Sequence, residues 1–535
     1  MPTPASNRPS PGALFAAAIL VAILIATIGL PLVGIALQLS APNPTPDARP
    51  ETSPWSWGAV AETFLYTTLI GGLATTIALP GAWLMRRRSA LAGALLGLPL
   101  LMPTYLAYAG WGLLRGPGSS LGDLLGRAPP WVSTSFDRSL AVVGLSLWAW
   151  PIAAFVIGAA ARRIPAHLLD ALDVEPGPAW RKTRVVVGML FTSIVGSIAL
   201  IALAMAGSAV PLHLAQADTY AVHLWRFMLT NADPASVWHA SWPLFLLAVI
   251  GALAVFRAVS RERPPIADEG DTPHRPIART ATLVAGGVWF LAVIAPGLLF
   301  AAHIRHWSPV GESALVKFWR FNSSAVVTSG LVAAAVGTFV AAVALATFSI
   351  RSARARGIQA RVASCSLVVF LAGAIIPGIL VGNATLGFWN APFLPRAAGD
   401  SLWPVVLAHT ARFGFLGALA GWWLGSLETP DERGARLMLA GDSLRAWAAL
   451  CLRPHIGVVV GIALAGAALS LHEIESTVIL QPPGPTSLAQ YMLDKLHYNR
   501  NEDLCAAGVN LFAVGLAVAL ASGFLIARTR LPRRQ

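Results

Sequence analysis

Long apolar runs alternate with short polar segments along the whole chain. A helix needs about 20 predominantly apolar residues to cross a membrane, and twelve runs approach or exceed that length. They lie roughly at 13–39, 58–84, 91–113, 139–160, 186–208, 241–257, 281–303, 323–350, 362–384, 402–425, 455–473 and 505–527. The pattern therefore predicts an all-α polytopic membrane protein with about 12 transmembrane helices.

The composition excludes an ordinary soluble domain. Hydrophobic residues make up 56% of the 535 positions and charged residues only 12%, whereas soluble domains carry roughly 25% charged residues. The first run, 13–39, is about twice as long as the ~7–15-residue apolar core of a signal peptide, so we expect a retained span. The three cysteines lie in no metal-ligand or redox spacing and are interpreted as core-filling thiols.

The net charge of +13 is explained by short basic clusters between the apolar runs. No basic stripe with interleaved aromatic residues is present, so we expect membrane lipid and no nucleic acid as a partner. With a cytoplasmic N-terminus, 26 Lys and Arg residues fall in inside segments and 11 in outside segments. The positive-inside rule then predicts that both termini are cytoplasmic.

Two polar segments, 162–189 and 428–454, interrupt the apolar pattern on the predicted inner side. The first has an acidic half, a break at Pro176-Gly177-Pro178 and a basic half. The second has a polar helix, a break at Gly441 and a basic half that contains tryptophan. Glycine allows the backbone to end one helix and start another at an angle, and proline fits the first turn of a helix. We therefore expect each segment to be a bent pair of short helices.

The chain shows signs of internal duplication. The basic cluster that starts at Arg86 and the one that starts at Arg351 are 265 residues apart, and so are Pro176 and Gly441. An identical offset at two separated landmarks predicts a repeated six-span unit. A Pro-rich, charged stretch lies between the two halves. The predicted domains are the first repeat at 1–257, a cytoplasmic linker at 258–280 and the second repeat at 281–535.

The two polar segments resemble the loop signature of the transmembrane subunits of binding-protein-dependent ABC importers of type I. That signature is Glu-Ala-Ala, three residues, Gly, nine residues, Ile, any residue and Leu-Pro. The first copy has Asp170-Ala171-Leu172 in the Glu-Ala-Ala place and Trp180 at an often aromatic position, but Pro176 where Gly is expected, Gly177 one later and Gly188-Met189 in place of Leu-Pro. The second copy has Gly441 and Pro454 at the signature's spacing, with Ala435-Arg436-Leu437 in place of Glu-Ala-Ala.

A third region is similar to a branch with two fused permease halves that serves ferric iron and, more distantly, thiamine and polyamine. This branch has a Glu near a helix end, a Pro-Pro-Gly turn, a Leu-Ala or Leu-Ser pair and a Tyr-rich helix in that order. Glu473, Pro482-Pro483-Gly484, Leu488-Ala489 and His497-Tyr498 fill these places. The resemblance favours ferric iron as the substrate.

The resemblance implies a permease of a bacterial inner membrane, driven by a separate cytoplasmic ABC ATPase dimer that uses ATP and Mg. A soluble or lipid-anchored substrate-binding protein would deliver the substrate, docking on the outer loops 209–240 and 474–504. The implied coupling residues are Asp170, Ala171, Pro176, Gly177, Trp180, Arg181, Lys182, Gly441, Arg445 and Pro454.

The chain itself is not expected to be an enzyme or to bind a cofactor. None of its three lysines, Lys182, Lys317 and Lys495, follows a glycine, which excludes a Walker A phosphate loop. Energy must come from a partner or from an ion gradient. An ion-gradient-driven secondary transporter is therefore the alternative, and such proteins place ionisable residues within spans. Glu62, His409 and Arg412 are the candidates.

A polar cluster follows the eleventh run at its predicted outer end. His472, Glu473 and Glu475 combine imidazole with hard oxygen ligands, a set that suits ferric ion. The same residues also fit an ordinary polar helix terminus at the membrane surface. We treat them as a candidate substrate pathway and assign no metal site.

Overall fold

The computed structural model describes residues 11–40, 55–85, 90–116, 119–174, 176–230, 234–261, 279–304, 313–355, 357–428, 430–440, 443–484, 486–497 and 501–528. Within these ranges the regular structure is entirely helical, and eleven helices are long and apolar enough to cross a membrane. The prediction of a polytopic α-helical membrane protein is confirmed at this level.

The helices up to residue 261 are α1 (Pro11–Leu24), the π-turn η1 (Ile25–Gly29), α2 (Leu30–Ser40), α3 (Trp57–Leu84), α4 (Ala90–Leu96), η2 (Leu98–Leu101), α5 (Thr104–Gly112), η3 (Leu113–Arg115), α6 (Ser120–Arg127), α7 (Pro130–Ala161), α8 (Ala166–Val174), α9 (Ala179–Ala206), α10 (Val210–Leu214), α11 (Tyr220–Thr230) and α12 (Pro234–Arg261).

The remaining helices are α13 (Arg279–Trp289), the π-turn η4 (Phe290–Ile294), α14 (Ala295–His303), α15 (Ala314–Ser352), α16 (Ile358–Ile375), α17 (Gly378–Trp389), α18 (Arg396–Gly399), α19 (Trp403–Leu427), α20 (Pro430–Ala440), α21 (Leu444–Trp447), the π-turn η5 (Ala448–Leu452), α22 (Arg453–Leu471), α23 (Glu475–Leu480), α24 (Leu488–His497) and α25 (Asn501–Arg528). Of the predicted linker, 258–261 and 279–280 belong to helices, and 262–278 lie outside the described residues.

Two of the predicted spans are not continuous helices. The third is divided into α4, η2 and α5, and the ninth into α16 and α17. The interruptions lie at Pro103 and Pro377, and the residues before them, Met102 and Ile376, are extended. A proline disfavours helical geometry in the residue before it, whereas Pro80 and Pro151 are accommodated inside α3 and α7.

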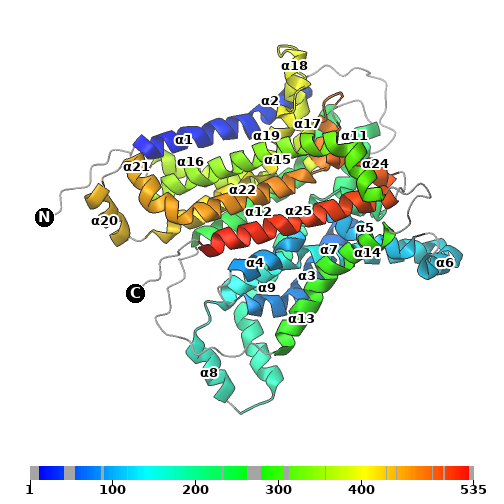
Figure 1. Cartoon of the computed structure of the whole chain (residues 1–535), viewed down its shortest axis with the longest axis horizontal. Coiled ribbons are helices and arrows are strands. Elements are labelled where there is room, and N and C mark those ends of the chain that lie inside the picture. Colours follow the sequence, from blue (N-terminus) through cyan, green and yellow to red (C-terminus); the bar gives the residue numbers. More distant parts are fainter. Residues whose placement is uncertain are drawn as a thin grey trace.

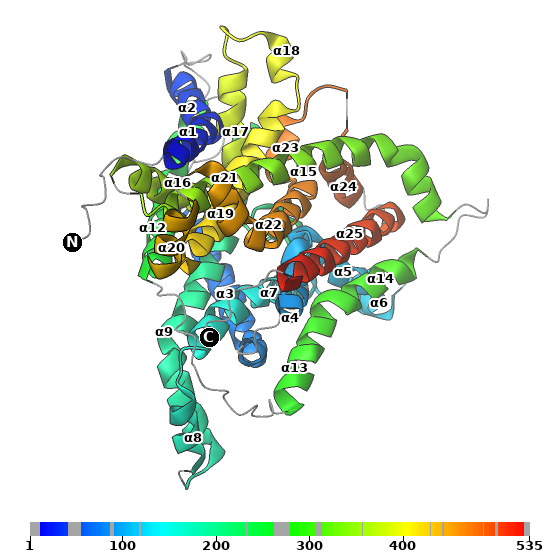
Figure 2. The same ribbon diagram turned by 60° about the vertical axis from the view of Figure 1, so that its left-hand side comes forward.

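Two groups of long helices form much of the body of the protein. Helix α3 packs against α7 and α9, and α15 packs against α19 and α22. The N-terminal helices α1 and α2 lie against α15, α16 and α17, while α13 packs on α3 and α14 packs on α5 and α25 (Figure 2). Each group is therefore covered by a helix from the other part of the chain.

Close helix approach depends on small residues, as is common where membrane helices meet. On α19, Gly421 faces α15, and a Cβ at this position would overlap the Ala344 carbonyl oxygen and come within 2.8 Å of the Thr347 Cβ. The lack of a side chain at Gly421 allows the backbones of α19 and α15 to approach closely.

Helices α8 and α20, which belong to the two polar segments, lie at one end of the bundle. Figure 1 shows α8 and α20 near the end where α1 begins and α25 finishes, whereas α6, α11 and α24 lie towards the opposite end. The two predicted polar segments are therefore on the same side of the molecule.

Candidate functional site

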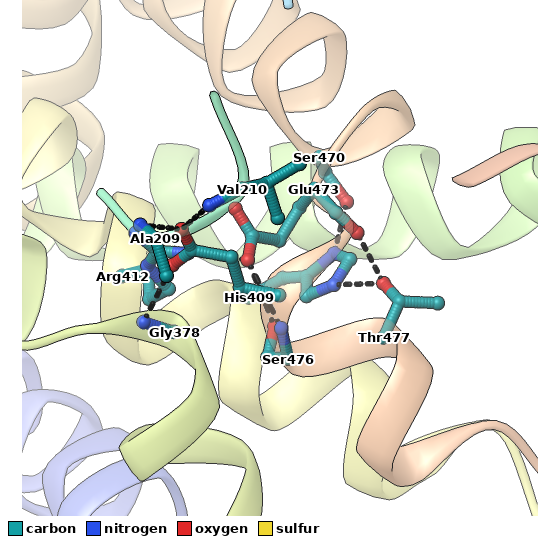
Figure 3. Close-up of polar contacts among 10 residues, drawn as sticks. Ala209, Val210, Gly378, His409, Arg412, Ser470, Glu473, Ser476 and Thr477 are labelled. Atoms are coloured by element: carbon teal, nitrogen blue, oxygen red, sulfur yellow. Dashed lines mark hydrogen bonds and ion pairs between the residues drawn. The ribbon is translucent and has the colours of Figure 1, made fainter. Parts of the chain in front are cut away.

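A buried ion-pair centre lies where α19 meets the turn between α22 and α23 (Figure 3). The Arg412 Nη1 atom contacts Glu473 Oε1 and lies 3.4 Å from Glu475 Oε2. The three side chains are only 14%, 10% and 8% exposed. Such charges are stable away from water only when they are paired and hydrogen-bonded, so we define Arg412, Glu473 and Glu475 as the polar centre.

The Glu475 carboxylate joins segments that are far apart in the sequence. Its Oε1 atom accepts hydrogen bonds from the backbone N–H groups of Ala209 at 2.8 Å and Val210 at 3.5 Å. Its Oε2 atom accepts one from the Gly378 N–H at 2.9 Å. These donors begin α10 and α17, where backbone N–H groups lack partners within the helix and favour a negative charge. One carboxylate thus holds the starts of α10, α17 and its own helix α23 together.

Glu473 is bound more locally. Its Oε1 atom accepts a hydrogen bond from the Ser476 N–H at 3.1 Å and one from the Ser476 hydroxyl at 3.3 Å, besides its contact with Arg412. The side chain therefore closes the first turn of α23 and anchors the guanidinium at the same time. Arg412 is nearer to Glu473 than to Glu475.

Gly378 makes the close approach of these groups possible. A Cβ at this position would overlap the Arg412 guanidinium and would lie 2.7 Å from both Glu473 Oε1 and the Glu475 Cβ. Contacts under 3 Å from a Cβ require the neighbours to move. Any larger residue would therefore separate α17 from the polar centre.

His409 lies one turn before Arg412 and is fully buried in a hydroxyl network. Its Nε2 atom is 2.9 Å from the Thr477 hydroxyl and its Nδ1 atom is 2.7 Å from the Ser470 hydroxyl. The Thr477 hydroxyl donates to the Glu473 carbonyl, so it accepts from Nε2–H, while the Ser470 hydroxyl is able to donate to Nδ1 or to accept from it. Both ring nitrogens of His409 are therefore paired with hydroxyl groups inside the bundle.

A small cavity adjoins the imidazole. The space open to the centre of a water-sized sphere is about 20 Å³, which is enough for one water molecule. Its polar lining is Thr328, Ser329, His409, Ser470, Thr477, Gln481 and Ser487. The arrangement places hydroxyl groups and an imidazole beside the polar centre inside an otherwise apolar bundle.

The structure brings together two of the three residues of the predicted substrate pathway. Glu473 and Glu475 are buried and bound to Arg412, and they do not lie at a surface helix terminus. His472 is only partly buried. Among the residues that the structure describes, no group of three or more His, Cys, Asp and Glu side chains is arranged to hold a metal ion.

Sequence reasoning named Arg412 and His409 as isolated residues within a span and missed their partners. Arg412 lies 61 and 63 residues before the two carboxylates that bind it. The available signal was a lone arginine in an apolar run, which is costly in a membrane without a partner. Nothing in the local pattern indicated which carboxylates would approach it.

The first polar segment lies largely at the surface. Asp170 and Ala171 are exposed on α8, Pro176 and Gly177 form an exposed bend, and α9 starts just after Pro178. Trp180 and Arg181 are exposed in the first turn of α9, with the Arg181 guanidinium 5.6 Å from the Trp180 ring centroid, and Lys182 is half-buried. Figure 2 shows α8 projecting away from the rest of the bundle.

The second polar segment is held against α15. Arg433 donates to the Ala353 carbonyl at 2.5 Å, and the Trp447 indole donates to the Ser352 hydroxyl at 2.8 Å. The Arg436 Nε atom lies 2.9 Å from Glu428 Oε1. Arg445 is exposed on α21, Pro454 is in the first turn of α22, and Gly441 lies outside the described residues.

No protein-family model matches the chain, and no curated protein matches it.

Proposed function

We propose that this protein is the transmembrane permease of an ATP-driven, binding-protein-dependent importer, built from two fused six-helix repeats. The observation that carries the proposal is the recurrence of several helical elements about 265 residues apart, although the helix interruptions at Pro103 and Pro377 are 274 residues apart. The π-turns η1 and η4 start at residues 25 and 290, and the helices that follow them carry Pro31 and Pro296 in their first turns. Both pairs are 265 residues apart, the offset that also relates the two polar segments.

Other elements support the same relation. Helix α8 starts at residue 166 and α20 at 430, α9 at 179 and α21 at 444, and α10 at 210 and α23 at 475. Helix α9 ends at 206, and the continuous helix formed by α21, η5 and α22 ends at 471. The first pair is 264 residues apart and the others are 265 apart. Unrelated halves have no reason to place short helices and irregular turns at nearly the same offset.

The two polar segments would couple the permease to its energy source. In the proposal, the α8 and α20 segments bind the two subunits of a cytoplasmic ABC ATPase dimer, and closure of that dimer on ATP and Mg moves the two halves relative to one another. The location of both segments at one end of the bundle supports this role. Their different attachment to the bundle supports unequal contacts with the two ATPase subunits.

The proposed substrate is ferric iron, delivered by a soluble or lipid-anchored binding protein on the outer face of a bacterial inner membrane. The two carboxylates of the polar centre support a cationic substrate, because they outnumber the single guanidinium. Oxygen ligands suit ferric iron. Both carboxylates are bound inside the protein, so a substrate would reach them only after these contacts open.

The proposal is tested by co-purification and transport. Neighbouring genes are searched for a Walker-A ATPase and a secreted binding protein. The chain is expressed with the proteins found, and ATP-dependent uptake of labelled ferric ion into vesicles is measured. Gly441→Asp, or the double reversal Arg181→Glu with Lys182→Glu, is expected to insert normally and to lose ATPase co-purification or stimulation. Unchanged stimulated ATP hydrolysis in these variants would contradict the coupling role.

An ion-gradient-driven secondary transporter is the second candidate, and one observation favours it. The structure gathers Arg412, two carboxylates and an imidazole inside the bundle, and buried ionisable groups in membrane proteins are commonly ion or proton relays. Uptake into sealed vesicles that continues without any ATPase and stops on addition of an ionophore would establish this candidate over the first.

A further inference from the structure

We propose that Glu475 is a latch that holds the two halves together at their meeting point, and that Arg412 positions it. The inference rests on the proposed two-repeat permease and assigns the residues whose contacts must exchange when the pathway opens.

The contact lies at the boundary that the proposed symmetry defines. Val210 and Glu475 are 265 residues apart and begin the equivalent helices α10 and α23. Glu475 accepts from the N–H of Val210 and of its neighbour Ala209. Where a residue touches its own counterpart, the contact lies beside the axis that relates the halves. A pathway between the halves would run along that axis.

The polar centre belongs to the second half alone. Its residues Glu475, Glu473 and Arg412 correspond, 265 positions earlier, to Val210, Ser208 and Leu147, and the adjacent His409 corresponds to Gly144. The first half builds the same order of helices without any charge at these places. The centre is therefore not needed to form the fold of a repeat, which points to a role at the junction between repeats.

Glu475 has partners on both sides of that junction. From the first half it accepts the N–H groups of Ala209 and Val210, and from the second it meets the Gly378 N–H and the Arg412 guanidinium. Moving α10 away from α23 would break the two hydrogen bonds from Ala209 and Val210 and leave the buried Glu475 carboxylate with fewer donors. Arg412 Nη1, at 3.4 Å from Glu475 Oε2, is placed to form a closer ion pair with Glu475 when the halves separate. The carboxylate thus has a set of partners for each arrangement of the halves.

The latch is tested by thiol labelling of the full-length protein in lipid vesicles. A cysteine is introduced by Val210→Cys, which keeps the backbone N–H and lies at a position only 3% exposed. Its reaction with a membrane-impermeant maleimide is compared with that of the native Cys505, which is fully buried in α25. Cys505 reports general unfolding, and the introduced cysteine reports separation of α10 from α23.

Adding Glu475→Ala is expected to raise the labelling rate of the introduced cysteine about tenfold, because hydrogen bonds to a charged group are lost, while Cys505 stays unreactive. Glu475→Gln keeps an acceptor and is expected to give a smaller increase. Glu428→Gln is the matched control, since Glu428 is a buried carboxylate paired with Arg436 at the far end of α19. It is expected to leave labelling at position 210 unchanged.

Two results would overturn the latch. Labelling of the introduced cysteine that does not change in Glu475→Ala shows that the carboxylate does not hold α10. A parallel increase at Cys505 shows that Glu475 only stabilises the fold. The labelling needs no ATPase, so its outcome is separate from that of the proposed function, which fails if the wild-type chain binds no ATPase.

Discussion

Replacing Arg412 by methionine is the most direct test of the polar centre. Methionine keeps an unbranched apolar stem and removes the guanidinium with its charge and its donors. The change leaves Glu473 and Glu475 without a cation, and both side chains are at most 10% exposed. Removing one partner of a buried ion pair costs about 3–5 kcal/mol. Because Glu475 keeps three N–H donors and Glu473 keeps the donors of Ser476, we expect the lower end, about 3 kcal/mol.

The assay is equilibrium unfolding of the full-length protein in mixed micelles, followed by circular dichroism. A second variant combines Arg412→Met with Glu473→Gln, which removes the carboxylate nearest to the guanidinium. We expect this double variant to recover about 1–2 kcal/mol, since directly interacting groups show coupling energies of roughly 0.5–3 kcal/mol.

Arg226→Met supplies the control. Arg226 also pairs with a carboxylate, Asp218, at 2.9 Å, but the two side chains are 50% and 41% exposed, and exposed ion pairs contribute about 0–1 kcal/mol. If Arg412→Met lowers the free energy of unfolding no more than Arg226→Met, the charges of the polar centre do not hold the helices together and the reasoning fails.

Three further changes test the packing around the centre. Gly378→Ala should lower the free energy of unfolding by about 1–3 kcal/mol, because its Cβ would overlap the Arg412 guanidinium. Gly72→Ala has nothing within 4 Å of the new Cβ and should leave stability unchanged or raise it by up to about 1 kcal/mol; an equal loss in both glycine variants would contradict the close approach. Gly421→Ala should separate α19 from α15 and reduce the melting temperature by several degrees, and an unchanged melting curve would rule out that contact. His409→Phe should cost about 1–3 kcal/mol, because the buried Ser470 hydroxyl loses the imidazole as its partner and the Thr477 hydroxyl keeps only the Glu473 carbonyl. A stable variant that still transports would show that the imidazole is dispensable.

The class of protein and most of its helices follow from the sequence alone. Runs of about 20 apolar residues can satisfy their backbone groups in a membrane only as helices, so the pattern of such runs predicts helices wherever one run fills one span. The same pattern failed at Pro103 and Pro377, where apolar character continued but the helix did not. Pro80 and Pro151, in contrast, lie inside continuous helices. Hydropathy does not distinguish a proline that interrupts a helix from one that a helix accommodates.

The assembly of the polar centre depends on the tertiary structure. Arg412, Glu473 and Glu475 were each visible as ionisable residues beside or within apolar runs, but the sequence does not say that α19 presents one to the others across 61 and 63 residues. The three backbone donors of Glu475 carry no side-chain signal at all, and two of them are 265 and 266 residues away. Hydropathy acts along one helix at a time, so it specifies which segments enter the membrane. The partners of a buried charge depend on how distant helices pack, and only the folded chain determines that.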